Sequence, residues 1–223
     1  MRSKRIVTVI ALMMTAAPPT AFAQSTPHVE VGVFAGWTFS DGVQIDTPIL
    51  ALNGNAYDRV DPKDSGSWGF NVGVLTGEHA EFGFIYGQQF SKLQFGGTTD
   101  TEIGDLSIKT YHGYFAYNFG EGPVRPFLYG GFGATNFGSV DFSVPRGSGT
   151  IGSETQFSTT WGAGVKIIPG GHFGARAAFK MTPTYIKTDS AGWWCDPFWG
   201  CYVVGNAQYS NQFEFSGGVI ARF

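Results

Sequence analysis

Apolar side chains occupy every second position through much of this chain, which is the pattern of a β-strand with one apolar face. The segment 29–39 shows it clearly, because its odd positions carry Val29, Val31, Val33, Ala35, Trp37 and Phe39. The same alternation predicts eight strands, at about 28–40, 66–76, 79–92, 106–119, 124–138, 155–168, 172–188 and 211–223. Each segment is long enough for a tilted strand to cross a bilayer, which takes about 9–11 residues.

The connections between these strands alternate in length. Residues 77–78, 120–123 and 168–172 are short turns, whereas 41–65, 93–105, 139–154 and 189–210 are long loops. Membrane barrels have short turns on the periplasmic side and long loops outside. The predicted fold class is therefore all-β: an eight-stranded antiparallel up-and-down transmembrane β-barrel. An exported soluble barrel with an apolar interior is the alternative.

Side-chain volume decides which face of the strands points inward. The interior of an eight-stranded barrel is only wide enough to be filled by side chains. The apolar faces carry most of the strand Trp, Phe, Tyr and Val residues, which would overfill it. The opposite faces carry polar groups and the glycines Gly32, Gly36, Gly69, Gly73, Gly83, Gly87, Gly162, Gly164, Gly174 and Gly218. We therefore expect aromatic side chains to face lipid, with the facing of 124–138 left open because it is apolar on both sides.

The first 23 residues have the features of a cleaved signal peptide. Arg2, Lys4 and Arg5 precede an apolar run at 6–17, and Ala21-Phe22-Ala23 provides a small-x-small cleavage site. The run is shorter than the about 20 residues that a membrane helix needs. The sequence thus predicts a leader at 1–23 and a single barrel domain at 24–223.

Composition agrees with an exported membrane protein. Aromatic residues make up 16% of the chain and charged residues only 14%, which excludes an intrinsically disordered protein. The formal net charge is −3, and removal of the three basic residues of the leader would make it −6. A chain with this charge and no basic block beyond the leader is not expected to bind nucleic acid.

These features together resemble a known family. The leader, the eight alternating strands, the sequence RPFLYGGFGA at 125–134 and the final aromatic strand are similar to the small outer-membrane barrels of Gram-negative bacteria, the OmpA/OmpX-like group. The resemblance implies an outer-membrane location, with contacts to membrane lipid and lipopolysaccharide. We also expect the barrel to be a monomer. The resemblance further implies that the barrel-insertion machinery reads the last strand, including Phe213, Phe215 and Phe223. Members include structural proteins, adhesins and a few enzymes, so the resemblance does not fix an activity.

Several charged or titratable side chains fall on the predicted inner faces of the strands. They are Glu30, Glu81, His112, Lys166, Arg176, Lys180, Glu214 and Arg222, with Arg125 as a further candidate. Buried charges have to be paired, because an unpaired one costs several kcal/mol. The first and last strands are neighbours in a closed barrel, so we expect Glu30 to lie close to Arg222. We also expect Arg176 in the same layer and Lys180 near Glu214. Such a network is either a plug or the lining of a conduit.

The loop at 189–210, called loop four below, contains both cysteines of the chain. An exported protein meets oxidising conditions, so we predict a disulfide between Cys195 and Cys201. Five aromatic residues lie around it: Trp193, Trp194, Phe198, Trp199 and Tyr202. They either form an adhesive or ligand-binding tip or pack on one another over the barrel mouth. In the loop at 41–65, called loop one, the apolar run 49–52 either packs under loop four or forms an extra strand.

Catalytic and cofactor signatures are absent from the sequence. Lipid A-modifying barrels use a His/Ser/acid set at the rim, but His28, His79 and His172 fall at periplasmic ends, and His112 has no serine two residues on. No nucleotide or metalloprotease motif is present, and we expect no metal and no cofactor. The sequence favours a non-enzymatic outer-membrane protein with a structural or surface-interaction, adhesin-like role through its loops. The first alternative is a narrow channel for ions or small solutes, and the second is a lipid-modifying enzyme.

Overall fold

The computed structural model describes residues 28–50, 56–97, 100–144, 147–169, 172–186, 195–196, 200–201 and 208–223. The predicted leader lies outside this part of the chain. None of the described residues forms a helix that is long and apolar enough to span a bilayer.

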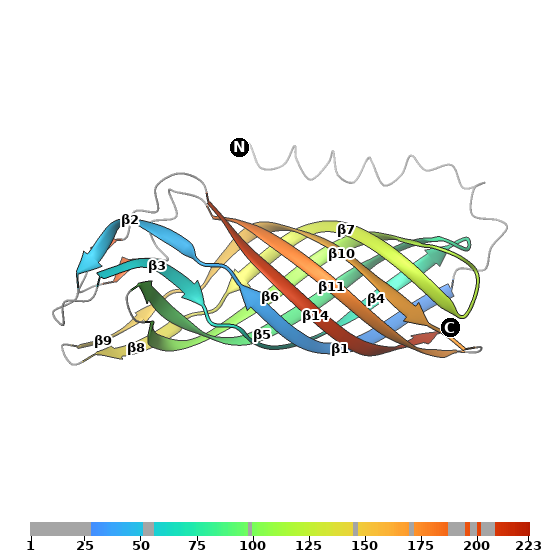
Figure 1. Cartoon of the computed structure of the whole chain (residues 1–223), viewed down its shortest axis with the longest axis horizontal. Helices are drawn as coiled ribbons and strands as arrows, with labels where there is room; N and C mark the ends of the chain where they lie inside the picture. The colour runs from blue at the N-terminus through green and yellow to red at the C-terminus, as the bar shows by residue number, and fades with distance from the viewer. Residues whose placement is uncertain are drawn as a thin grey trace, which may run out of the picture.

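Eight long strands close into one antiparallel barrel, which confirms the predicted fold class (Figure 1). Each strand pairs with its neighbours in sequence, and the first closes on the last. In order around the barrel the strands are β1 (His28–Ser40), β4 (Ser65–Thr76), β5 (Ala80–Gly97), β6 (Thr101–Asn118), β7 (Val124–Phe137), β10 (Glu154–Ile167), β11 (Phe173–Ile186) and β14 (Gln208–Arg222). Short turns lie at the end that carries the C-terminus, and the long connections lie at the other end (Figure 1).

Shorter strands extend the sheet at the loop end. Loop one forms β2 (Val43–Leu50) and β3 (Ala56–Pro62), and β3 pairs with the end of β5 where β4 has stopped. With this pairing, β5 continues beyond residue 92, where the alternation predicts its end. Strand β6 likewise begins before residue 106, its predicted start. The other hairpins are β8 (Val140–Val144) with β9 (Gly147–Ile151), and β12 (Cys195–Asp196) with β13 (Gly200–Cys201). Ile49 and Leu50 therefore belong to an extra strand, one of the two expectations for that run.

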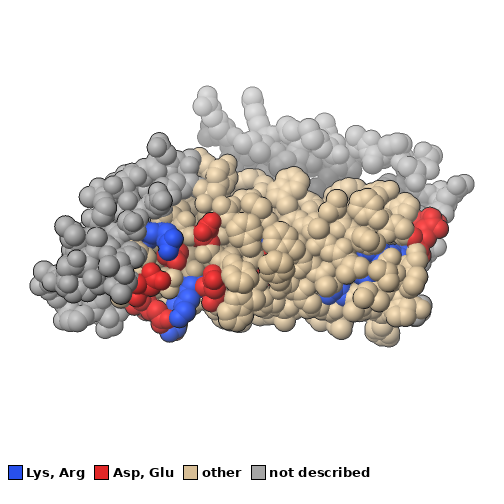
Figure 2. Space-filling view, in the orientation of Figure 1, with Lys and Arg blue, Asp and Glu red and all other residues tan. Residues whose placement is uncertain are grey.

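The outer face of the barrel is apolar. Its large exposed side chains include Trp37, Trp68, Phe82, Phe115, Leu128, Phe132, Trp161, Phe179 and Phe215. The polar side chains of the same strands point inward, so the two faces differ as they do in barrels that sit in hydrocarbon. Figure 2 shows the result: an uncharged middle surface between charged side chains at the two ends.

Several aromatic side chains nevertheless lie inside the barrel, and four of them each pack on a glycine that is paired with them on the next strand. Phe34 covers Gly69, Tyr114 covers Gly83, Phe127 covers Gly164 and Tyr129 covers Gly162. A Cβ atom on any of these glycines would lie 2.3–2.7 Å from the nearest ring atom of its partner. The pairs also fix the facing of β7, where Phe127 and Tyr129 are buried and Leu128 and Phe132 face outward. The expectation that large aromatics belong outside is therefore incomplete.

These contacts predict that Gly162→Val will destabilise the barrel. A Cβ at this position would meet the Tyr129 ring at 2.3 Å and the Phe179 carbonyl oxygen at 2.6 Å, and such overpacking costs about 1–3 kcal/mol. The measurement is urea unfolding of the folded barrel in lipid vesicles. Gly217→Val is the matched control, because nothing lies within 4 Å of a Cβ there. Equal stability of the two variants would contradict this account of the packing.

Candidate functional site: the barrel interior and its rims

A buried ion-pair network crosses the turn-side half of the lumen. Lys166 on β10 places its Nζ 2.7 Å from Glu30 Oε1 on β1 and 2.5 Å from Glu81 Oε2 on β5. All three side chains are at most 1% exposed. Because β10 lies on the far side of the barrel from β1 and β5, Lys166 reaches across the lumen to both of them.

The strand pairing explains the rest of this layer. Glu30 faces Arg222 across the β1–β14 pair, and Arg222 Nη2 lies 2.8 Å from Glu30 Oε2. Glu81 accepts further hydrogen bonds from the Tyr114 hydroxyl at 2.6 Å and from Asn118 Nδ2 at 3.4 Å. The two carboxylates are thus each held by two or more donors, as buried charges require.

Arg176 lies in this region but forms no ion pair within the described part of the chain. Its guanidinium carbon sits 4.6 Å from the centre of the Phe127 ring and 5.6 Å from that of Tyr129. The cation is therefore stabilised by aromatic faces instead of a carboxylate. Arg125 lies outside the lumen network, because it donates to the carbonyl oxygens of Gly122 and Glu121 in the β6–β7 turn.

A second charged layer lies toward the loop end. Lys180 Nζ is 3.1 Å from Glu214 Oε2, and the same oxygen accepts hydrogen bonds from Ser67 at 3.0 Å and Thr38 at 3.5 Å. Above it, Gln212 donates to Gln89, which in turn donates to Ser40 of β1 and Ser65 of β4. Two cavities in this part of the lumen measure about 10 Å³ each, which is the space of about one water molecule.

His112 has a buried serine partner that sequence spacing could not reveal. Its Nε2 lies 2.8 Å from Ser158 Oγ, although the two residues are 46 positions apart. Thr135 and Thr184 continue the hydroxyl chain at 2.9 and 3.0 Å. No carboxylate of the described residues bonds to His112, and Ser158 is fully buried. The pair has the elements of a nucleophile and a base but lacks an acid and access for a substrate, so it satisfies polar groups in the interior.

An apolar cluster closes the lumen at the loop end. It consists of Val43, Val60, Leu93, Leu106, Ile108, Phe137, Val140 and Ile186, all at most 4% exposed. Loop one and β8 supply three of these side chains, so the cap is built by segments outside the eight-stranded wall. Among the described residues the interior thus contains ion pairs, aromatic rings, polar networks and this cap.

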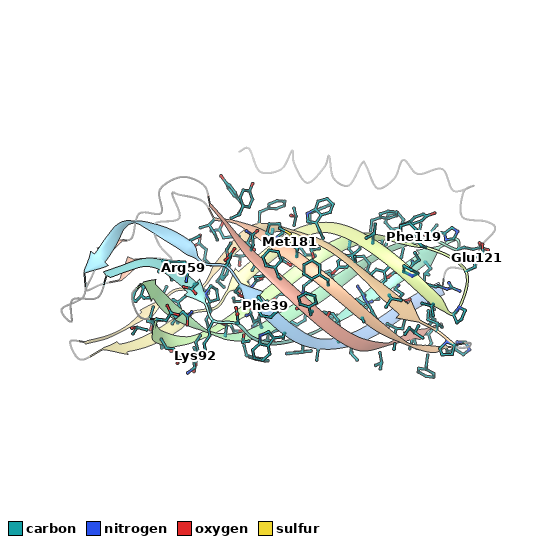
Figure 3. The ribbon with its side chains drawn as sticks, in the orientation of Figure 1. Phe39, Arg59, Lys92, Phe119, Glu121 and Met181 are labelled. Atoms are coloured by element: carbon teal, nitrogen blue, oxygen red, sulfur yellow. The ribbon has the colours of Figure 1, made fainter. Side chains whose placement is uncertain are left out.

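The outer rim carries a ladder of charges beside the cap. Glu102 accepts hydrogen bonds from Lys63 at 2.6 Å and from Lys92 at 2.7 Å. Arg59 and Asp61 form a further pair at 3.3 Å. These side chains gather at the loop end in Figure 2, and Figure 3 labels Arg59 and Lys92 there. The hydrogen bonds from Lys63 and Lys92 hold the pKa of Glu102 at about 2, well below its ordinary value of 4.5.

Loop four is described only in part. The backbone pairing of β12 with β13 places Cys195 directly opposite Cys201. Directly opposed residues of antiparallel strands have Cα atoms about 4.5–5.5 Å apart, within the range that a disulfide spans. The cysteine side chains and Trp193, Trp194, Phe198, Trp199 and Tyr202 lie outside the described part, so the disulfide and the aromatic tip stay predictions. Phe213, Phe215 and Phe223 are described, and all three lie on the outward face of β14 or at its end.

Residues 7–223 match the family model described as outer membrane protein beta-barrel domain. The chain belongs to this family. It is an outer-membrane protein of bacteria, as the resemblance implies. No protein with a curated description matches it.

Solved structures share the fold. The outer membrane protein OprG from Pseudomonas aeruginosa superposes with a TM-score of 0.60 at 12% identity, covering 91% of this chain and 98% of its own. Neisserial surface protein A gives 0.54 at 13% identity, with 87% and 97% covered. The outer membrane protein AlkL gives 0.53 at 13% identity, with 93% and 95% covered. Such low identities establish a common barrel and leave the activity open.

The crossing of the lumen by Lys166 predicts a large loss of stability for Lys166→Met. Glu81 would lose its ion-pair partner while fully buried, which costs about 3–5 kcal/mol. Adding Glu81→Gln should recover part of that loss, because the uncompensated charge is then removed. Urea unfolding in vesicles measures both. Lys63→Met is the control, since an exposed pair contributes at most about 1 kcal/mol; a similar loss in both single variants would refute the role of Lys166.

The charge ladder predicts an acid-resistant contact at the outer rim. Because the pKa of Glu102 is lowered, its pairing is complete above the ordinary carboxylate pKa of 4.5 and is lost only as the pH falls through about 2. An NMR titration of the Glu102 side-chain carbonyl carbon should give a midpoint of about 2. Lys63→Gln should move that midpoint upward, and an unshifted midpoint near 4.5 in the native chain would disprove the ladder.

Proposed function

We propose that this barrel is a non-conducting surface protein of the outer membrane whose long loops contact an extracellular partner in an adhesin-like manner. The observation that carries the proposal is the filled lumen. A conduit needs a continuous polar path, whereas here Lys166 bridges opposite walls and an apolar cluster covers the loop end.

The arrangement of the charges supports a plug over a channel lining. Channel walls present charges of one sign to a water-filled path. In this lumen the charges of opposite sign touch one another: Lys166 with Glu30 and Glu81, and Lys180 with Glu214. An ion entering from either side would have to replace these contacts in a space that holds about one water molecule.

The loop end supplies what an interaction surface needs. Strands β5 and β6 carry the loop-one hairpin outward on a sheet, which gives the exposed ladder of Glu102, Lys63 and Lys92 a rigid base. The sequence places an aromatic-rich loop four at the same end, and clustered apolar side chains outside a membrane are typical of contact sites. A disulfide between Cys195 and Cys201 would hold that loop in one conformation.

The proposal also accounts for the His112–Ser158 pair without an enzyme. Lipid-modifying chemistry needs its catalytic groups at the rim, in reach of a lipid head group, whereas these two side chains are buried in the lumen. Lipid A from cells that express the protein should therefore have an unchanged mass spectrum. New lipid A species that disappear with Ser158→Ala would favour the enzyme over the surface protein.

Two measurements test the proposal directly. In planar bilayers the full-length barrel should show no stable channel openings, and discrete, reproducible openings in the intact protein would support the narrow channel instead. In the second measurement, cells that display the native protein are compared with cells that display its variants. The quantity measured is binding to host-cell surfaces and to extracellular-matrix proteins.

The variants for the binding test replace the five aromatics of loop four by serine: Trp193, Trp194, Phe198, Trp199 and Tyr202. We expect them to reduce binding at least about 10-fold at equal surface display, because aromatic anchors dominate contact energies. Phe90→Ser, on the lipid-facing wall, is a control for the loss of an exposed aromatic. Binding that is absent in the wild type, or unaffected by the loop variants, would overturn the adhesin-like role.

A further inference from the structure

Two turns at the periplasmic end bring together three side chains that can ligate a metal. Glu78 and His79 belong to the β4–β5 turn, and Glu121 belongs to the β6–β7 turn. A ring nitrogen of His79 and one carboxylate oxygen from each glutamate all lie within 4.8 Å of one another. The turns are adjacent because Ala80 pairs with Tyr117 at the ends of β5 and β6. Figure 3 labels Glu121 at this end of the barrel.

The imidazole of His79 is held in an orientation suited to a metal ligand. Its Nδ1 lies 2.9 Å from the carbonyl oxygen of Asn118, and because a carbonyl only accepts, Nδ1 carries the proton and donates it. Nε2 is then the ring nitrogen left to act as a ligand. The ring also stacks on Tyr117, with centroids 5.4 Å apart. Metal-binding histidines almost always donate their other N–H to a carbonyl or carboxylate in this way.

The backbone around His79 is fixed as well. Its carbonyl oxygen accepts hydrogen bonds from the Asn118 backbone N at 2.8 Å and from Asn118 Nδ2 at 3.1 Å. Asn118 thus connects the two turns through three hydrogen bonds. The ring position does not depend on a bound ion, and the exposed glutamate side chains can adjust around it.

Glu78 and Glu121 form no ion pair with a cation of the described part of the chain. Arg125 is the neighbouring cation, but its Nη2 and Nε donate to the backbone carbonyls of Glu121 and Gly122, at 3.2 and 3.0 Å. Two carboxylates and an imidazole at close range offer oxygen and nitrogen ligands to a divalent cation.

We propose that Glu78, His79 and Glu121 bind one divalent transition-metal ion, with Zn²⁺ as the best match, and that this ion joins the two turns. Zn²⁺ accepts imidazole nitrogen and carboxylate oxygen at about 2.0–2.2 Å, whereas Ca²⁺ and Mg²⁺ prefer oxygen ligands alone. Ligand atoms around a tetrahedral Zn²⁺ lie about 3.4 Å apart. Rotation of the two exposed glutamates closes the remaining distance, and water completes the coordination.

The test is calorimetric titration of the chelator-treated, refolded full-length barrel with Zn²⁺, Mg²⁺ and Ca²⁺. The protein carries no polyhistidine tag, and the cysteines are kept oxidised so that thiolates cannot compete. We expect one Zn²⁺ per chain and weaker binding of Mg²⁺ and Ca²⁺. His79→Gln and Glu121→Gln should each lower the Zn²⁺ affinity at least about 10-fold, since even residues that only support a ligand have effects of that size.

His172→Gln is the matched control. His172 sits in the β10–β11 turn and donates from Nδ1 to the Arg222 carbonyl at 2.9 Å, but it belongs to no group of metal ligands in the described residues. It should leave Zn²⁺ binding unchanged. Electrophoretic heat-modifiability reports whether each variant folds. If His79→Gln does not fold, the Zn²⁺ affinity of Glu121→Gln decides the test. No Zn²⁺ binding at millimolar concentration, or equal loss in His172→Gln and Glu121→Gln, would overturn the site.

Discussion

The rest of this structure depends on the narrow interior of an eight-stranded barrel. Every strand turns half of its side chains into a space that is only as wide as those side chains. Charges placed there cannot be solvated, so they have to meet one another. Lys166 forms ion pairs with both Glu30 and Glu81. Arg222 also pairs with Glu30, and Lys180 pairs with Glu214. These charged side chains of the lumen are therefore held in buried ion pairs.

The same constraint explains the glycines. Rings such as Phe127 and Tyr129 fit inside because the strand beside them carries glycine at the paired position. The glycines therefore do more than narrow the lumen: they are recesses that accept large side chains from the neighbouring strand. Aromatic residues are found on both faces of the wall, in hydrocarbon outside and on glycine inside, which is why apolar residues alternate less clearly along β7.

Much of the fold follows from the sequence because a strand in a membrane barrel is a local pattern. Alternation over about ten residues, together with connection lengths, identifies all eight strands and the closure of the first on the last. The contact between Glu30 and Arg222 follows from that closure, because both residues lie at the same end of adjacent strands. The partners across the lumen do not follow: Lys166 and Glu81 are 85 positions apart, and the pairing depends on how the barrel curves. The contact between His112 and Ser158 does not follow either, because the two residues are 46 positions apart. The extension of β5 depends on β3, a strand in a loop.

The ion pair between Glu30 and Arg222 sits at the seam where the two ends of the sheet meet. Sliding β14 along β1 by two residues would keep every polar side chain inward but would separate the carboxylate from the guanidinium, leaving both without their contact at the periplasmic end. The stagger of strands around a closed barrel sets its shear, and shear with strand number sets its diameter. One electrostatic contact at the seam therefore helps to select the width of the whole cylinder.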